Sequence, residues 1–118
     1  MKTAVLTRAV MPSVANPNGT MFGGELMKWM DELSGIAAVR FAGKNVTTAA
    51  VNVSFIRPIP VRSVIELNAG VCYVGNTSMR VNVSVTMDGP EPVKVADAMF
   101  VYVAIDDDGH PVPVGKTL

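Results

Sequence analysis

The segment at 23–41 constrains the fold more than any other. Its apolar residues recur at helical spacing and would cover more than half of the circumference of a helix. At about 100° per residue, only a narrow polar stripe remains between them. The residues concerned are Leu26, Met27, Trp29, Met30, Leu33, Ile36, Ala37 and Phe41. "AGKN" at 42–45 provides a stop signal. The sequence therefore predicts a helix from Gly23 or Gly24 to about Arg40 that other elements surround.

Strand patterns fill the chain on both sides of this helix. Val, Ile and Thr are frequent, and apolar and polar residues alternate most clearly in "MRVNVSVTM". We expect one strand before the helix and four after it, at 3–11, 46–56, 63–74, 78–87 and 93–105. Three of the four joins are short, which favours an antiparallel meander of the later strands.

These elements predict an α+β fold, in which a curved antiparallel sheet of about five strands cradles one long helix. The chain has 118 residues, a length typical of one domain, so we expect a single domain over 1–118.

Composition excludes several classes of function. No apolar run approaches the roughly 20 residues of a membrane span, although 49% of the residues are hydrophobic and eight are methionine. This excess favours a subunit interface. Ten basic and ten acidic residues balance without a basic cluster, so we expect neither nucleic acid nor membrane as a partner. The first residues lack the pattern of a secretory signal, which predicts a cytoplasmic protein.

Few residues are available for metal or nucleophilic chemistry. Cys72 and His110 are the only residues of their types, which excludes a thiolate cluster and makes a Ser-His-Asp triad improbable. The acidic run at 106–109 lacks the alternating ligand spacing of a calcium loop, so we interpret it as a solvated turn. We therefore expect no metal site.

Asp31 is the acid that this elimination leaves. It lies at the border of the apolar face of the helix, one turn from Gly35 and two turns from Gly24, with Ser34 alongside. The ordinary interpretation is a partly exposed helix carboxylate. However, a helix that begins at Gly23-Gly24 presents unpaired N–H groups that suit a carbonyl oxygen gaining negative charge.

The loop before the helix contributes further polar groups. Asn16 and Asn18 are the polar side chains nearest the start of the helix. Turn formation is the ordinary interpretation of both. Together with a carboxylate and free amides, they would form an acyl-transfer site that needs neither histidine nor metal.

The order of elements and four segments resemble the hot-dog-fold acyl-CoA thioesterases, most closely the bacterial acyl-CoA hydrolases and their animal cytosolic relatives. The segments are "ANPNGTMFGGELMKWMDE", "TTAAVNVSFIRPI", "VGNTSMRV" and "FVYVAIDDDGHPVPV". The resemblance extends from about residue 8 to 114. It implies subunits that pair their sheets edge to edge, and dimers that assemble into a trimer of dimers, a hexamer.

The resemblance also implies roles for single residues. The catalytic acid of the family falls on Asp31, and its asparagine falls on Asn16, contributed by the opposite subunit. Gly23 and Gly24 match the glycines whose N–H groups polarise the thioester carbonyl. Coenzyme A, which is part of the substrate and not a cofactor, would lie near Arg57, Thr77 and Ser78. Phe22 occupies a position where many relatives have histidine.

The expected activity is hydrolysis of acyl-CoA to a free acid and coenzyme A, with Asp31 as general base or as nucleophile. The alternatives are an acyl-CoA-binding module of the same fold, a dehydratase, and a purely structural oligomer. A dehydratase of this fold would need a histidine paired with an acid, and His110 is poorly placed for that. The sequence leaves open the preferred acyl chain and the choice between hexamer and tetramer.

Overall fold

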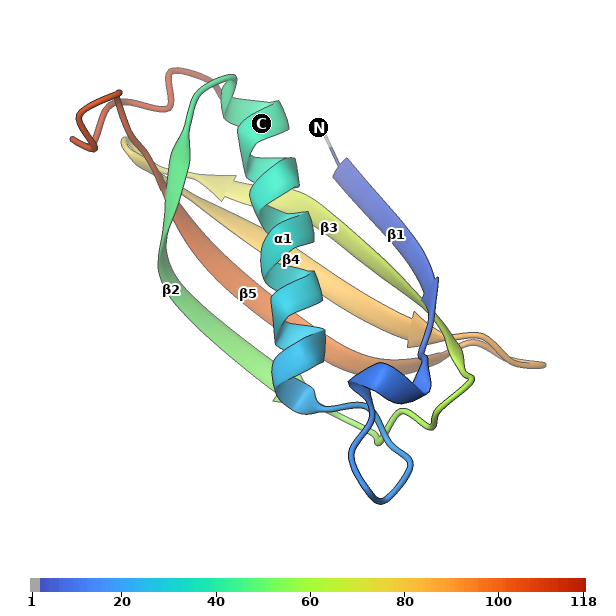
Figure 1. Ribbon diagram of the computed structural model, residues 1–118. Coiled ribbons are helices and arrows are strands. Elements are labelled where there is room, and N and C mark those ends of the chain that lie inside the picture. The colour runs from blue at the N-terminus through green and yellow to red at the C-terminus, as the bar shows by residue number, and fades with distance from the viewer. Residues whose placement is uncertain (1–2) are drawn as a thin grey trace.

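One long α-helix lies in the concave face of a five-stranded antiparallel sheet, as the sequence predicts (Figure 1). The computed structural model describes residues 3–118. The elements are β1 (Thr3–Ala9), a short 3-10 helix η1 (Pro12–Val14), α1 (Gly23–Ala42), β2 (Val46–Phe55), β3 (Val64–Val74), β4 (Ser78–Met87) and β5 (Val93–Ala104). Residues 1 and 2 of the domain that we predict over 1–118 lie outside the described residues.

The strand order is β1-β3-β4-β5-β2. The meander that we predict is confirmed for β3, β4 and β5 but is wrong for β2, which pairs with β5 and not with β3. The reason lies in the connection at 56–63, where Pro58 and Pro60 cannot donate to a ladder. This segment instead crosses the end of the sheet and bonds to the loop before α1, through Met21 N to Ile59 O and Val61 N to Gly19 O.

The ends of α1 follow from local chemistry. The helix starts at Gly23, after Phe22 in extended conformation. It ends where Gly43 adopts a left-handed conformation, with φ 69°, and donates its N–H to Val39 O at 2.8 Å. Glycine is the residue that adopts this conformation at least cost. α1 therefore extends over 20 residues. No helix in residues 3–118 combines the length and the hydropathy that crossing a bilayer requires.

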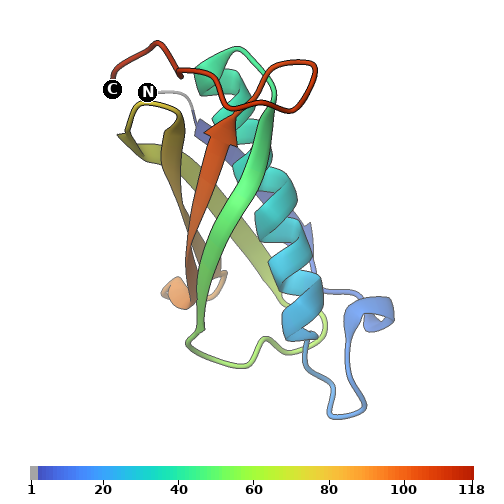
Figure 2. The same ribbon diagram turned by 90° about the vertical axis from the view of Figure 1, so that its left-hand side faces the viewer.

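The core lies between α1 and the central strands. Met30 and Ala37 of the helix are fully buried, as are Leu67 and Val83 on the sheet. Burial alternates along β4, whereas β2 is exposed along almost its whole length. Figures 1 and 2 both place β2 beside α1, on the side opposite β1. The sheet thus ends on one flank of the helix in a strand that few side chains cover.

Exposed apolar side chains gather along the seam between α1 and β2. They come from both elements and are Met27, Ile36, Val39, Val51 and Phe55, between 36% and 53% exposed. Contiguous exposed apolar surface is typical of an interaction site. The excess hydrophobicity of the chain is therefore partly located at this seam.

Candidate active site

Asp31 lies on α1 where the helix faces β2, and two hydroxyl groups reach the same oxygen of its carboxylate. The hydroxyl of Tyr102, on β5, lies 3.2 Å from Asp31 Oδ1, and Thr48 Oγ1, on β2, lies 3.5 Å from it. Residues 3–118 donate no hydrogen bond to Oδ2. The carboxylate is thus held at one oxygen and leaves the other available.

A buried polar pair lies directly beneath this carboxylate. Tyr102 is 2% exposed and Ser34 is fully buried, and their hydroxyl oxygens are 2.7 Å apart. Both hydroxyls also lie 3.0 Å from the main-chain oxygen of Asp31. Burial raises the pKa of the Tyr102 phenol to about 12, against the lowering effect of its hydrogen bond with Ser34, and the charge of Asp31 adds to the rise. At neutral pH, Tyr102 therefore keeps its proton and can donate it.

Two hollows open on either side of Asp31 along the seam. The larger, of about 500 Å³, runs toward the end of α1, past Gly35 and Ile36. The smaller, of about 370 Å³, runs toward the start of the helix, past Gly24 and Met27. Asp31 and Thr48 line both hollows. Their surfaces are largely apolar, so the carboxylate lies between two spaces that suit an elongated, mainly apolar molecule.

Sequence reasoning missed two of these residues, Thr48 and Tyr102. A polar "TT" pair at the start of an otherwise apolar strand was the available signal for Thr48. Tyr102 lies two residues after Phe100 on a strand whose alternate residues face α1, which was the available signal that its hydroxyl points inward. Nothing in the sequence places either residue beside Asp31. Tyr102 lies 71 residues further along the chain, and Thr48, although only 17 residues after Asp31, reaches it through the position of β2 in the sheet, which local signals do not specify.

Asn16 organises the loop that precedes α1. Its Oδ1 accepts the backbone N–H groups of Asn18, at 2.9 Å, and Thr20, at 3.2 Å. Its Nδ2 donates to Thr20 Oγ1 at 3.0 Å. These contacts match the turn-forming interpretation of Asn16. Within one protomer, the described contacts do not bring this side chain to Asp31.

Gly23 and Gly24 lie at the first turn of α1, where the N–H groups have no acceptor within the helix. Phe55 packs against Gly23, and a Cβ at that position would lie 3.3 Å from the end of the phenyl ring. The helix rises about 1.5 Å per residue, so the two glycines precede Asp31 by about 10–12 Å along the axis. Their N–H groups point away from Asp31, because helix amides point toward the N-terminus. One protomer therefore does not present both groups to a single carbonyl.

The residues expected near coenzyme A are not together in one protomer. Arg57 follows β2 and lines a hollow of about 340 Å³ beside Gly23. Thr77 and Ser78 lie at the start of β4. Through the pairs Phe55–Ala96 and Ser78–Val103, these groups lie seven residues apart along β5, or about 23 Å.

The acidic run near the C-terminus forms a turn that its own side chain stabilises. Asp106 Oδ1 accepts the N–H groups of Asp108 and His110, each at 2.9 Å. All three side chains are exposed or nearly so, and their ligand atoms lie within 4.8 Å of one another. These contacts are those of a solvated turn.

Comparison with known proteins places this arrangement in a family. A family model described as the thioesterase superfamily matches residues 18–94. The chain belongs to the thioesterase superfamily. The acyl-CoA thioester hydrolase YciA of Salmonella typhimurium is 38% identical over 117 residues, which cover 93% of this chain and 88% of the relative. The helix cradled by the sheet is thus the hot-dog fold that the sequence predicts.

Solved structures agree with this assignment. An acyl-CoA hydrolase of Staphylococcus aureus, determined with butyryl coenzyme A, coenzyme A and coenzyme A disulfide, superposes with a TM-score of 0.91 at 35% identity, covering 94% of this chain and 70% of that one. A hexameric thioesterase of Yersinia pestis superposes with a TM-score of 0.86 at 34% identity, covering 93% of each chain.

The Staphylococcus aureus hydrolase has also been solved with single residues replaced by alanine, namely one aspartate, one threonine and one asparagine. In that protein, the asparagine stands 15 positions before the aspartate and the threonine 17 positions after it. Asn16, Asp31 and Thr48 have the same spacing.

Proposed function

We propose that this protein hydrolyses acyl-CoA thioesters to a free acid and coenzyme A. The observation that carries the proposal is the Asp31 carboxylate, held at one oxygen by Tyr102 and Thr48 and open to two largely apolar hollows. Membership of the thioesterase superfamily and the acyl-CoA hydrolase activity of the relatives support it. The spacing shared with the three substituted residues of the Staphylococcus aureus enzyme supports roles for Asn16, Asp31 and Thr48.

Asp31 supplies the chemistry by one of two routes. As general base, its free Oδ2 takes a proton from water while the water oxygen bonds to the thioester carbon. The tetrahedral intermediate then expels coenzyme A as thiolate, which takes up the proton. As nucleophile, a carboxylate oxygen bonds to the same carbon and the thiolate leaves, and water then hydrolyses the mixed anhydride. Neither route needs a bound cofactor.

The oxyanion is stabilised, in this proposal, by the Gly23 and Gly24 amides of a second protomer. A hydrogen-bonded carbonyl oxygen lies about 3 Å from its donor, whereas the glycines of the same protomer precede Asp31 by about 10–12 Å and point away. A second copy would bring its own loop, Asn16 included, to the open seam. The exposed apolar side chains at the seam and the hexameric relatives support this arrangement.

Coenzyme A would lie along the same interface, with Arg57 from one protomer and Thr77 and Ser78 from another as candidate contacts. We propose a dimer whose sheets pair edge to edge, and a trimer of such dimers. The cytoplasmic location expected from the sequence stays a prediction.

The test follows thiol release from a series of acyl-CoA thioesters, from acetyl to palmitoyl, with Asp31→Asn measured in parallel. We expect wild-type protein to release coenzyme A and the variant to lose at least about 100-fold in kcat, the scale of a missing general base. Asp31 is exposed at the helix surface, so the variant should unfold at the same denaturant concentration as wild type.

The other outcomes are equally clear. Folded Asp31→Asn with wild-type turnover would remove Asp31 from the reaction. Tight acyl-CoA binding without release of thiol, from any chain length, would make the protein a binding module of the same fold.

A further inference from the structure

The pair Tyr102 and Ser34 is unusual within this core, which is otherwise apolar. Ser34 is the only residue outside the apolar and aromatic classes that is buried among residues 3–118. Burying two hydroxyl groups costs free energy unless both are hydrogen-bonded. Here both are bonded. Within residues 3–118, the bonds that leave the pair run to Asp31, and Thr48 lies near enough to the tyrosine hydroxyl to oppose the rise in its pKa that burial causes.

Packing alone does not require the Tyr102 hydroxyl. Phe100 lies two residues earlier on β5, faces the same side, and stacks on Tyr102 with ring centroids 6.1 Å apart and planes 13° apart. Phenylalanine thus fits the layer between β5 and α1. Without the tyrosine, Ser34 would still donate to the main-chain oxygen of Asp31. The packing of the core therefore does not require the tyrosine hydroxyl.

The hydrogens of the pair allow three arrangements. In one, Tyr102 donates to Asp31 Oδ1 while Ser34 donates to the tyrosine oxygen, at 3.2 and 2.7 Å. In another, Tyr102 donates to Ser34, and Ser34 donates to the main-chain oxygen of Asp31 at 3.0 Å. In the third, Ser34 donates to the tyrosine oxygen and Tyr102 donates to the main-chain oxygen of Asp31 at 3.0 Å. All three arrangements satisfy both hydroxyls. Only the first fixes the carboxylate, since only there does the tyrosine proton reach Oδ1.

We propose that Tyr102 is a positioning residue, which holds the Asp31 carboxylate by Oδ1 so that Oδ2 faces the substrate. The proposal rests on the hydrolase function above. Thr48 reaches Oδ1 at the long distance of 3.5 Å and comes from an exposed strand, so it restrains the carboxylate less than the buried tyrosine does. A carboxylate without its fixed donor samples several rotamers, and a general base in the wrong rotamer cannot take the proton.

The experiment compares Tyr102→Phe with wild type in thiol release from the best acyl-CoA substrate. We expect kcat to fall about tenfold and KM to stay within twofold, because the change affects a group that acts on Asp31 and not on the substrate. Tyr73→Phe is the matched control, since Tyr73 is the other tyrosine of the chain and is 49% exposed; its kcat should equal that of wild type.

Coupling to Asp31 separates positioning from a merely structural role. In an Asp31→Asn background, Tyr102→Phe should cost no further activity, because the group that it positions no longer reacts. Ser34→Ala should lower kcat by less than Tyr102→Phe, since the tyrosine can still donate to Oδ1. If Tyr102→Phe does not fold, the same measurements use Tyr102→Met, in which a flexible side chain fills the space without a hydroxyl.

Three results would overturn the proposal. One is a Tyr102→Phe protein with kcat within twofold of wild type. Another is an equal loss in the wild-type and Asp31→Asn backgrounds. The third is a larger loss for Ser34→Ala than for Tyr102→Phe. A wild-type protein without thioesterase activity would overturn the proposed function as well, whereas the first three results leave that function intact.

Discussion

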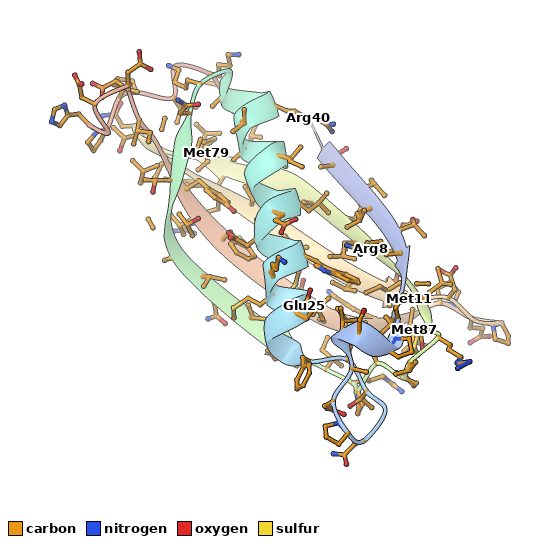
Figure 3. The ribbon with its side chains drawn as sticks, in the orientation of Figure 1. Arg8, Met11, Glu25, Arg40, Met79 and Met87 are labelled. Carbon is orange, nitrogen blue, oxygen red and sulfur yellow. The ribbon has the colours of Figure 1, made fainter. Side chains whose placement is uncertain are left out.

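The two sides of α1 differ in how edge strands cover them. On the side of β1, Arg8 reaches toward the helix and its guanidinium lies 4.1 Å from the ring centroid of Trp29 (Figure 3). Arg40 donates to the main-chain oxygen of Thr3 at 3.0 Å, near the end of the helix. On the side of β2, Asp31 instead faces the two hollows.

This difference assigns packing to the side of α1 that faces β1 and the candidate catalytic carboxylate to the side that faces β2. Both flanking strands are sheet edges, so topology alone does not distinguish the two sides. On the closed side, a large indole is 3% exposed and an arginine covers it. On the open side, the helix has glycine at position 35, and Asp31 Oδ2 receives no hydrogen bond from the described residues 3–118. The closed side thus supplies stability, whereas the open side is the one that the proposed function assigns to substrate and a second protomer.

The largest expected effect tests the closed side. Trp29→Ala removes a buried indole and should lower the free energy of unfolding by about 3–5 kcal/mol, through lost burial and the cavity that remains. Urea unfolding at matched protein concentration measures it. Met27→Ala on the open side is the control and should cost far less, because Met27 is 36% exposed. A loss under 1 kcal/mol for Trp29→Ala would contradict the division of the helix.

A mixing experiment tests what covers the open side. Asp31→Asn and Asn16→Ala chains are unfolded together and refolded. If each site takes Asp31 from one protomer and Asn16 from another, about a quarter of the sites are intact after random mixing, since an isologous interface uses the same patch twice. We expect about a quarter of wild-type activity from two variants that are nearly inactive alone.

The control for this experiment mixes Asp31→Asn chains with chains that carry both substitutions, and no activity should return. Mixed oligomers without recovered activity, with their formation verified by mass spectrometry, would place the whole site within one protomer.

The smallest effect concerns Gly35 on the open side. A Cβ there would lie 3.7 Å from the Tyr102 hydroxyl, an ordinary contact, and alanine is favoured over glycine in a helix interior by about 0.5–1 kcal/mol. Gly35→Ala should therefore raise the unfolding temperature by a few degrees, measured by circular dichroism.

Gly43→Ala is the matched comparison, since Gly43 has φ 69° and alanine at this conformation is strained. It should lower the unfolding temperature. Destabilisation by Gly35→Ala would show that the neighbouring hollow does not accommodate even a methyl group.

Most of the fold was predictable because its signals are local. Helical spacing placed α1 to within two residues at its C-terminal end, and the turn residues placed the ends of the later strands. The position of β2 was not predictable from the lengths of the joins, because the prolines at 58 and 60 turn a short join into a crossing. Only the choice of partner strand was wrong.

The residues of the candidate site also differ in whether local sequence signals could predict them. Asp31 could be selected as the candidate catalytic acid because sequence spacing alone gives its neighbours on the helix. Tyr102 reaches it from a strand 71 residues further along the chain and Thr48 from the strand that follows α1, and the placement of both depends on strand order and register. Asn16, Gly23 and Gly24 are locally ordered, but the role proposed for them with Asp31 involves a second chain, which local signals cannot describe.

The strand order also has a consequence for how this protein is made. Among the described strands, β2 pairs only with β5. Residues 46–55 therefore have no partner strand until residues 96–104 have been synthesised. Pairings this distant in sequence slow folding, because a long loop must close before any contact forms. During synthesis, the full pairing of β2, whose Thr48 lines both hollows beside Asp31, can form only after residue 104 has left the ribosome. Until then β2 is an unpaired strand, and an unpaired strand in a nascent chain is prone to aggregate.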